Sequence, residues 1–272
     1  MLIALIQVAS PELESVADRR TRVGDLVAEA AGRGATLVVL PELWPSGYFA
    51  FDQYEAQAEP LNGDTVSAMS EWARASRVQL LGGSFLERGD GGAVHNTSVL
   101  FDAAGTLTHS YRKIHVFGYQ SQEAKLLEPG RSIGVVDTGF GVLGATTCYD
   151  LRFPELYRLL VDQGAQVVVV PAAWPAARLE HWRLLTQVRA VENQVFVLAC
   201  NAVGEQAGVR LGGHSRVVDP WGVVLAEAGD AEEILYCKID LERVTEVRTE
   251  FPVLKDRRLF VDAGSHTESS VS

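Results

Sequence analysis

Ten short apolar runs recur along the chain, and each has the length and the β-branched content of a β-strand. They lie at residues 2–8, 36–40, 78–85, 97–101, 133–137, 142–147, 166–170, 195–200, 215–218 and 234–239. Helical spacing and capping residues mark four segments between them, at residues 15–32, 65–76, 154–163 and 179–193. Helices and strands mixed in this way predict an α/β domain with sheet inside and helices outside.

Two of these runs are apolar on both faces, the Leu-Val-Val-Leu of residues 37–40 and the four valines of residues 167–170. Strands of this kind lie in the interior of a layered domain, so the sequence predicts two sheets packed face to face. Because no Pro- or Ser-rich linker interrupts the chain, we expect a single domain over residues 1–263. Residues 264–272 are small and polar, which is typical of a flexible terminus.

The chain is acidic, with 35 Asp and Glu against 24 Lys and Arg and a formal net charge of −11. Neither nucleic acid nor an anionic membrane surface is therefore an expected partner. The same field repels small anions, so an anionic substrate would need its own Arg or Lys in the pocket. No apolar run approaches the roughly 20 residues of a membrane helix, and the apolar start of the chain lacks the basic residues of a signal peptide.

The three cysteines, Cys148, Cys200 and Cys237, form neither a disulfide framework nor a zinc-binding spacing. This usage favours the reducing cytoplasm as the location of the protein. The sequence also lacks a His-Glu-x-x-His pattern, a phosphate-binding loop and a dinucleotide-binding glycine fingerprint. We therefore expect no metal and no cofactor.

Glu42 is the first residue whose position indicates chemistry. It follows Pro41 at the end of the apolar run 37–40 and precedes Leu43 and Trp44. Apolar surroundings raise the pKa of a carboxyl group, which suits a general base working near neutral pH. Position alone fits a helix N-cap or an ion-paired loop carboxylate equally well.

Cys148 stands at the end of the apolar run 142–147, shortly before Pro154, a residue that favours the start of a helix. A strand, a sharp turn and a helix present a nucleophile at the edge of a sheet. A helix N-terminus and a nearby ammonium group would lower the pKa of the thiol. The alternative is a buried core cysteine, which is how we interpret Cys200 and Cys237.

Lys113 lies in the Tyr-Arg-Lys-Ile-His segment of residues 111–115, where polar and apolar side chains alternate. The alternation predicts a strand end or an extended loop that leans on the core. A lysine held in a pocket there would stabilise an oxyanion, whereas most lysines are simply solvated.

These three local strings, in this order, resemble the catalytic motifs of the nitrilase superfamily of carbon–nitrogen hydrolases. They read Pro-Glu-Leu-Trp-Pro-Ser-Gly-Tyr (41–48), Tyr-Arg-Lys-Ile-His (111–115) and Thr-Cys-Tyr-Asp-Leu-Arg-Phe-Pro-Glu (147–155). The resemblance continues through residues 181–182, 189–193 and 213–222, and so covers nearly the whole chain. Within the superfamily the sequence is most similar to the small Nit-type amidases, which include omega-amidases and amidases of deaminated glutathione.

The resemblance implies a four-layer αββα sandwich that assembles as a homodimer or a larger homo-oligomer. It also implies that Glu42, Lys113 and Cys148 form a catalytic triad. A second catalytic glutamate after the lysine is typical of the family. Glu123 aligns best with it, although Glu128 lies close by in the sequence.

Three residues are expected to bind substrate: Tyr149, whose backbone N–H would help to hold an oxyanion, Trp174 and Arg152. Arg178 is the alternative cation. Trp174 lies in Pro-Ala-Ala-Trp-Pro (171–175), which departs from the omega-amidase pattern. Its ring predicts an apolar, planar pocket wall, which argues against an oxo-dicarboxylate substrate.

The mechanism implied by the resemblance is the hydrolysis of a small-molecule amide by water, through a thioester. Glu42 takes the proton of Cys148, and the thiolate attacks the amide carbon. Lys113 and the Tyr149 N–H stabilise the oxyanion, ammonia leaves, and water activated by Glu42 releases the acid. A nitrile or N-carbamoyl amine hydrolase, and an inert binding protein on the same fold, are the alternatives.

Overall fold

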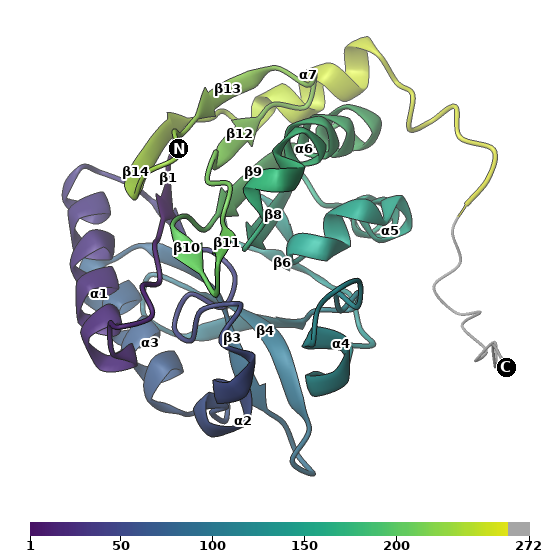
Figure 1. Cartoon of the computed structure of the whole chain (residues 1–272). Helices are drawn as coiled ribbons and strands as arrows, with labels where there is room; N and C mark the ends of the chain where they lie inside the picture. The colour runs from purple at the N-terminus through teal and green to yellow at the C-terminus, as the bar shows by residue number, and fades with distance from the viewer. Residues whose placement is uncertain (261–272) are drawn as a thin grey trace, which may run out of the picture.

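Two six-stranded sheets form the interior of the structure, a computed structural model that describes residues 1–260 (Figure 1). The strands of the first sheet are β1 (Leu2–Gln7), β2 (Leu37–Val39), β3 (Gln79–Arg88), β4 (Val94–Phe101), β5 (Leu107–Arg112) and β14 (Glu233–Lys238). Those of the second are β6 (Val135–Asp137), β7 (Val142–Ala145), β8 (Val167–Ala172), β9 (Phe196–Asn201), β12 (Arg216–Val218) and β13 (Val224–Glu227). A separate hairpin consists of β10 (Glu205–Gln206) and β11 (Val209–Arg210).

The strand order is β14-β1-β2-β3-β4-β5 in the first sheet and β13-β12-β9-β8-β7-β6 in the second. In the first sheet β1, β2 and β3 run parallel, and β5 returns to their direction because β4 is antiparallel to both of its neighbours. In the second sheet β7, β8 and β9 run parallel. The carboxyl ends of parallel strands meet at one edge of a sheet. The residues that follow β2, β5 and β7, which include Glu42, Lys113 and Cys148, therefore lie at such edges.

Helices cover the outer faces of both sheets and complete the four layers (Figure 1). On the first sheet lie α1 (Val16–Gly32) and α3 (Asp64–Ser76), and on the second α5 (Pro154–Asp162) and α6 (Leu179–Asn193). Val27 of α1 and Met69 of α3 pack into a cluster with the first sheet, and Trp182 of α6 packs into the cluster of the second. The shorter helices are α2 (Tyr54–Gln57), α4 (Glu123–Leu126), α7 (Glu242–Glu250) and the 3-10 turns η1 (Phe51–Gln53), η2 (Cys148–Arg152) and η3 (Ala176–Arg178).

The main core lies between the two sheets. Successive side chains of a strand point to opposite faces, so Ile3 and Leu5 of β1 belong to the core between the sheets, whereas Ala4 and Ile6 face the helices. The thiol of Cys200, on β9 of the second sheet, donates to the carbonyl of Ile6 in the first at 3.3 Å. Cys200 is fully buried there, which confirms its interpretation as a core residue.

All ten predicted strands and all four predicted helices are confirmed, with small shifts at their ends. The sequence missed β5, β13, α7, the short hairpin of β10 and β11, and the short helices α2 and α4. β5 and β13 each lie at one end of their sheet, and their side chains are mostly half-exposed or exposed, so an apolar run does not mark them. α7 buries only Val244 and Val247 among charged residues, too few for a clear helical pattern.

Two further expectations concern the ends of the chain and membranes. The predicted domain boundary at residue 263 and the predicted flexible segment 264–272 lie outside the described residues. Among the helices of residues 1–260, none is long and apolar enough to cross a lipid bilayer.

Candidate active site

The side chains of Glu42, Lys113 and Glu123 meet in the interior of the protein. The ammonium nitrogen of Lys113 donates to Oε1 of Glu42 at 2.8 Å and to the two oxygens of Glu123 at 2.8 and 3.0 Å. All three residues are buried, with at most 1% of their surface exposed. A buried lysine needs such partners, because its three N–H donors must be satisfied and its positive charge must be balanced.

Further donors hold the two carboxylates in place. Asn96 Nδ2, from β4, donates to Oε1 of Glu42 at 2.8 Å and to Oε1 of Glu123 at 3.3 Å. The Ala173 N–H donates to Oε2 of Glu42 at 2.9 Å, and Tyr48 Oη donates to Oε2 of Glu123 at 2.9 Å. Each carboxylate oxygen of the cluster thus has at least one partner, and the side chains cannot turn without breaking several hydrogen bonds.

The structure places Glu123, and not Glu128, beside Lys113. Glu128 is exposed, and its backbone instead pairs with β4: its N–H donates to Val94 and its carbonyl contacts His95. Glu123 begins α4, and its Oε2 also accepts the N–H of Phe117 at 2.8 Å.

Burial and charge shift the protonation of this cluster. Burial and the charge of Glu123 raise the pKa of Glu42, while Lys113 pulls it down. Burial alone would lower the pKa of Lys113, but the two carboxylates outweigh it and hold the pKa well above its usual value. Lys113 therefore stays charged, and Glu42 is a carboxylate that accepts a proton more readily than one in water.

Cys148 is the first residue of the turn η2, directly after the segment that follows β7. Its φ of 46° lies in the left-handed region, which residues other than glycine seldom adopt. Thr147 and Asp150 bracket it with a reciprocal pair of hydrogen bonds, including Thr147 N–H to Asp150 Oδ2 at 2.9 Å. The predicted sharp turn is present, and Pro154 opens α5 after a short intervening 3-10 turn.

The pKa of the Cys148 thiol is raised, whereas the sequence predicted that it would be lowered. Burial, the charge of Glu42 and a hydrogen bond to Glu42 raise its pKa, and they outweigh the opposing effect of Lys113. The predicted lowering by a helix N-terminus and an ammonium group is therefore wrong for this state of the site. The thiol is neutral at rest, and it becomes a thiolate only when Glu42 takes its proton.

A small pocket opens over Cys148. It is lined by Tyr48, Phe49, Phe117, Cys148, Tyr149, Arg152, Ala173, Trp174, Pro175 and Arg178. The three residues predicted to bind substrate, Tyr149, Trp174 and Arg152, are thus all brought to the nucleophile, and so is Arg178. The guanidinium of Arg152 lies over the Trp174 ring at 4.7 Å, so the indole forms a wall, as its residue type predicts.

Sequence reasoning missed Tyr48, Asn96 and the ring of Phe117. Tyr48 is the last residue of the glutamate string, so its position beside Glu42 offered a signal. Asn96 offered none except a polar side chain inside β4, whose eight residues are all buried.

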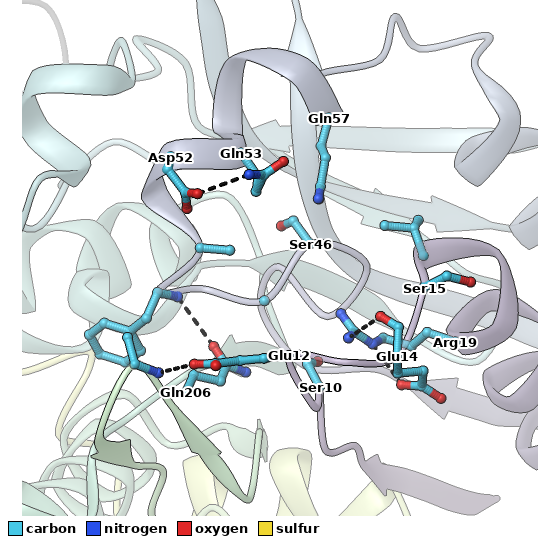
Figure 2. A pocket seen from close by; sticks show the side chains of 15 residues that line it. Ser10, Glu12, Glu14, Ser15, Arg19, Ser46, Asp52, Gln53, Gln57 and Gln206 are labelled. Carbon is cyan, nitrogen blue, oxygen red and sulfur yellow. Dashed lines mark hydrogen bonds and ion pairs between the residues drawn. The ribbon is translucent and has the colours of Figure 1, made fainter.

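A larger pocket lies elsewhere, with a volume of about 480 Å³ (Figure 2). Its wall includes Glu12, Arg19, Gln206 and the loop that carries Ser46, and it shares Phe49 with the Cys148 pocket. Many of its polar groups are bonded to one another or to backbone, as Figure 2 shows, and Cys148 and the buried cluster do not line it. The smaller pocket, which contains Cys148, is therefore the candidate active site.

Comparisons with known proteins give matches over nearly the whole chain. Residues 2–249 match the family model described as carbon-nitrogen hydrolase. The chain is 41% identical over 263 residues to a 2-oxoglutaramate amidase of Paenarthrobacter nicotinovorans, covering 94% of this chain and 89% of that protein. It is 40% identical over 270 residues to omega-amidase NIT2 of Homo sapiens, covering 94% of each. The crystal structure of Saccharomyces cerevisiae Nit3, a member of branch 10 of the nitrilase superfamily, superposes with a TM-score of 0.88 at 34% identity over 95% of this chain and 97% of that one.

Proposed function

Because this chain belongs to the carbon–nitrogen hydrolase family, we propose that it hydrolyses a small amide to a carboxylic acid and ammonia through a thioester on Cys148. One observation carries the assignment of residues: the cluster of Glu42, Lys113 and Glu123 adjoins the pocket that contains Cys148. A base, a fixed cation and a nucleophile are what acyl transfer requires. The names of similar proteins, two amidases among them, support an amide as the substrate.

The first step is the attack of the thiol. Glu42 takes the proton of Cys148 as the sulfur adds to the amide carbon, so that no free thiolate accumulates in the buried site. Lys113 and the Tyr149 N–H then stabilise the oxyanion of the tetrahedral intermediate. Lys113 suits this role because its two carboxylate partners hold it in position before the substrate arrives.

The later steps return the proton. The protonated Glu42 gives its proton to the amide nitrogen, the carbon–nitrogen bond breaks, and ammonia leaves the thioester behind. Water then attacks the thioester while Glu42 takes its proton, and the acid leaves as Cys148 regains its hydrogen. Glu123 supports this cycle by holding Lys113 and by sharing Asn96 with Glu42.

The substrate that the relatives favour is a monoamide of a 2-oxo dicarboxylic acid, such as 2-oxoglutaramate. From the sequence alone, the apolar ring of Trp174 argued against an anionic substrate of this kind. The pocket, however, also contains the guanidinium groups of Arg152 and Arg178, so an anionic substrate is compatible with it.

The test is ammonia release from a panel of 2-oxo dicarboxylate monoamides, short neutral amides, N-carbamoyl amines and nitriles. The Cys148→Ala protein is the blank, and Cys237→Ala, which removes a thiol from the distant strand β14, is the matched control. Turnover of an amide by the wild type and the control alone is the expected result. Turnover of nitriles alone would make the protein a nitrile hydrolase. If none of the compounds releases ammonia, the result would favour an inert binding protein.

Homodimerisation and a cytoplasmic location are further parts of the proposal. α6 exposes Leu184, Val188 and Val191 along one face, with Trp221 and Phe251 in edge contact with each other at 5.8 Å and also exposed. Gly222, next to Trp221, lies directly against Val191, so these side chains form one apolar surface. A second copy of this chain would cover it. The three cysteines are free thiols, which suits a reducing compartment.

A further inference from the structure

The carboxylate of Asp150 joins the turn of the nucleophile to the segment that carries the lysine. It is fully buried in η2, two residues after Cys148. Its Oδ2 accepts the N–H of Thr147 at 2.9 Å and the hydroxyl of Tyr111 at 2.7 Å. Its Oδ1 accepts the backbone N–H of His115 at 3.0 Å, and Nδ1 of the same residue lies 2.7 Å away. Three of these four contacts therefore come from the lysine segment.

The two side chains that reach Asp150 from that segment flank the lysine. Tyr111 and His115 stand two residues before and two residues after Lys113, at the end of β5 in the first sheet. Asp150 follows Cys148 by two residues, after β7 in the second sheet. The carboxylate thus connects the two sheets where the cation and the sulfur must meet one substrate. Apolar packing is not directional, whereas hydrogen bonds depend steeply on distance and angle.

A cap for the turn would need only one of these contacts. The reciprocal hydrogen bonds between Thr147 and Asp150 already cap η2. Burial of a carboxylate costs free energy unless hydrogen-bond donors compensate for the lost water. An apolar side chain would join the two sheets without that cost, so the carboxylate contributes direction rather than cohesion.

The two donors from the lysine segment are held in place themselves. The ring of His115 stacks on Phe153, with centroids 3.7 Å apart and 5° between the planes. Because a carboxylate only accepts hydrogen bonds, Nδ1 of His115 carries the hydrogen in its contact with Asp150. Burial and the charge of Asp150 raise the pKa of Tyr111 well above its usual value, so its hydroxyl keeps its proton and donates.

We propose that Asp150 is a positioning residue of the reaction, and that through Tyr111 and His115 it fixes the sulfur of Cys148 relative to the ammonium of Lys113. This inference rests on the proposed function of Cys148. The oxyanion must lie within hydrogen-bond reach of Lys113 while its carbon is bonded to the sulfur. Misplacement by about 1 Å costs about 100-fold in rate. Asp150 does not line the Cys148 pocket, so its contacts act on kcat and not on KM.

The experiment removes the donors one at a time and measures ammonia release from the preferred amide of the panel. His115→Ala removes the Nδ1 contact, and we expect kcat to fall about 10- to 100-fold while KM stays within about threefold. His115→Asn offers an amide N–H at the place of Nδ1, so part of the lost activity is expected to return. Tyr111→Phe removes a single oxygen atom and is expected to lower kcat about 10-fold. It keeps the test open if His115→Ala does not fold.

His109→Ala is the matched control. His109 is a half-buried histidine of the same strand as Tyr111, and its Nε2 has no hydrogen-bond partner within residues 1–260. Its loss is expected to leave kcat and KM unchanged. Equal losses in His115→Asn and His115→Ala, or a loss that appears in KM, would overturn the positioning role while leaving the proposed amidase intact.

If the wild type hydrolyses no amide, the proposed function fails, and a short aldehyde tests the positioning by itself. Butanal is added while iodoacetamide alkylates Cys148, and protection from alkylation is measured. In the adduct the sulfur bonds to the aldehyde carbon, the carbonyl double bond becomes a single bond, and the thiol proton moves to the oxygen. That oxygen takes the place of the oxyanion beside Lys113.

We expect the butanal concentration that halves alkylation to rise about 10-fold in His115→Ala and to return in part in His115→Asn. Absence of protection in the wild type, or equal protection of the wild type and His115→Ala, contradicts the positioning role.

Discussion

The ammonium of Lys113 binds only one oxygen of Glu42, Oε1 at 2.8 Å, and leaves Oε2 to the backbone N–H of Ala173 at 2.9 Å. Ala173 lines the Cys148 pocket, and its N–H also reaches the thiol of Cys148. The two oxygens therefore have different roles in the proposal. Oε1 is fixed by the cation, and Oε2, which shares the Ala173 N–H with the sulfur, is the oxygen that we propose takes the proton.

Replacing Glu42 by Gln tests this division. The amide keeps an oxygen for Lys113 but cannot accept the thiol proton, so we expect kcat to fall about 10³-fold with little change in KM. Glu59→Gln is the matched control, since Glu59 binds Thr65 and does not line the pocket. Steady-state ammonia release measures both. Equal activity of the two variants would show that Glu42 is not the base.

The pH dependence of kcat/KM is the second prediction. Glu42 must be ionised to act as a base, and burial raises its pKa above the usual 4.5. Activity is therefore expected to rise with pH through a limb that lies above the ordinary range of a glutamate, and to fall away on the acid side. A pH–rate profile in buffers of constant ionic strength locates the limb. A limb at or below the ordinary glutamate value would contradict the role of burial.

Lys113→Met is expected to cost stability as well as activity. It removes the only cation that contacts Glu42 and Glu123 within the described residues, and leaves two carboxylates buried together. Removal of one partner from a buried ion pair destabilises by about 3 to 5 kcal/mol. Urea unfolding measures the loss.

A double variant separates charge from packing in that result. Adding Glu123→Gln to Lys113→Met removes one of the two repelling charges, so part of the lost stability is expected to return while activity stays absent. If the double variant is less stable than the single one, repulsion between the carboxylates is not the cause.

The apolar surface on α6 gives the last prediction. Leu184→Asp places a charge where a second copy is proposed to pack, and should convert a dimer to a monomer in sedimentation experiments. Leu13→Asp is the control, because Leu13 is fully exposed and lies in the loop before α1, far from α6 in the sequence. A dimer that persists in Leu184→Asp would place the interface elsewhere.

Sequence alone predicted the layers and the residues whose local strings are distinctive. Glu42, Lys113 and Cys148 each follow a strand in one of the two sheets, so strand direction and the packing of the two sheets together bring them close. β5 was missed because most of its side chains are exposed or half-exposed, so no apolar run marks it.

The acidity of Cys148 was predicted with the wrong sign, because a sequence shows the neighbours along the chain but not the depth of burial. The choice between Glu123 and Glu128 also depended on a contact that forms only in the folded chain. Only the position of α4 shows that one carboxylate faces Lys113 while the other faces solvent. Asn96 was missed for the same reason, since its partners Glu42 and Glu123 lie far away in the sequence.

The pairing of β14 with β1 has a consequence for synthesis of the protein. Leu2 of β1 lies opposite Lys238 of β14, so β1 leaves the ribosome long before the strand that covers one of its edges. The strands that position Glu42 and Lys113 can pair earlier, but one side of β1 stays open until Glu233–Lys238 emerges. A nascent chain of this topology carries an unpaired strand edge until Lys238 has been made, and an open edge of this kind is a site of aggregation from which chaperones protect a nascent chain.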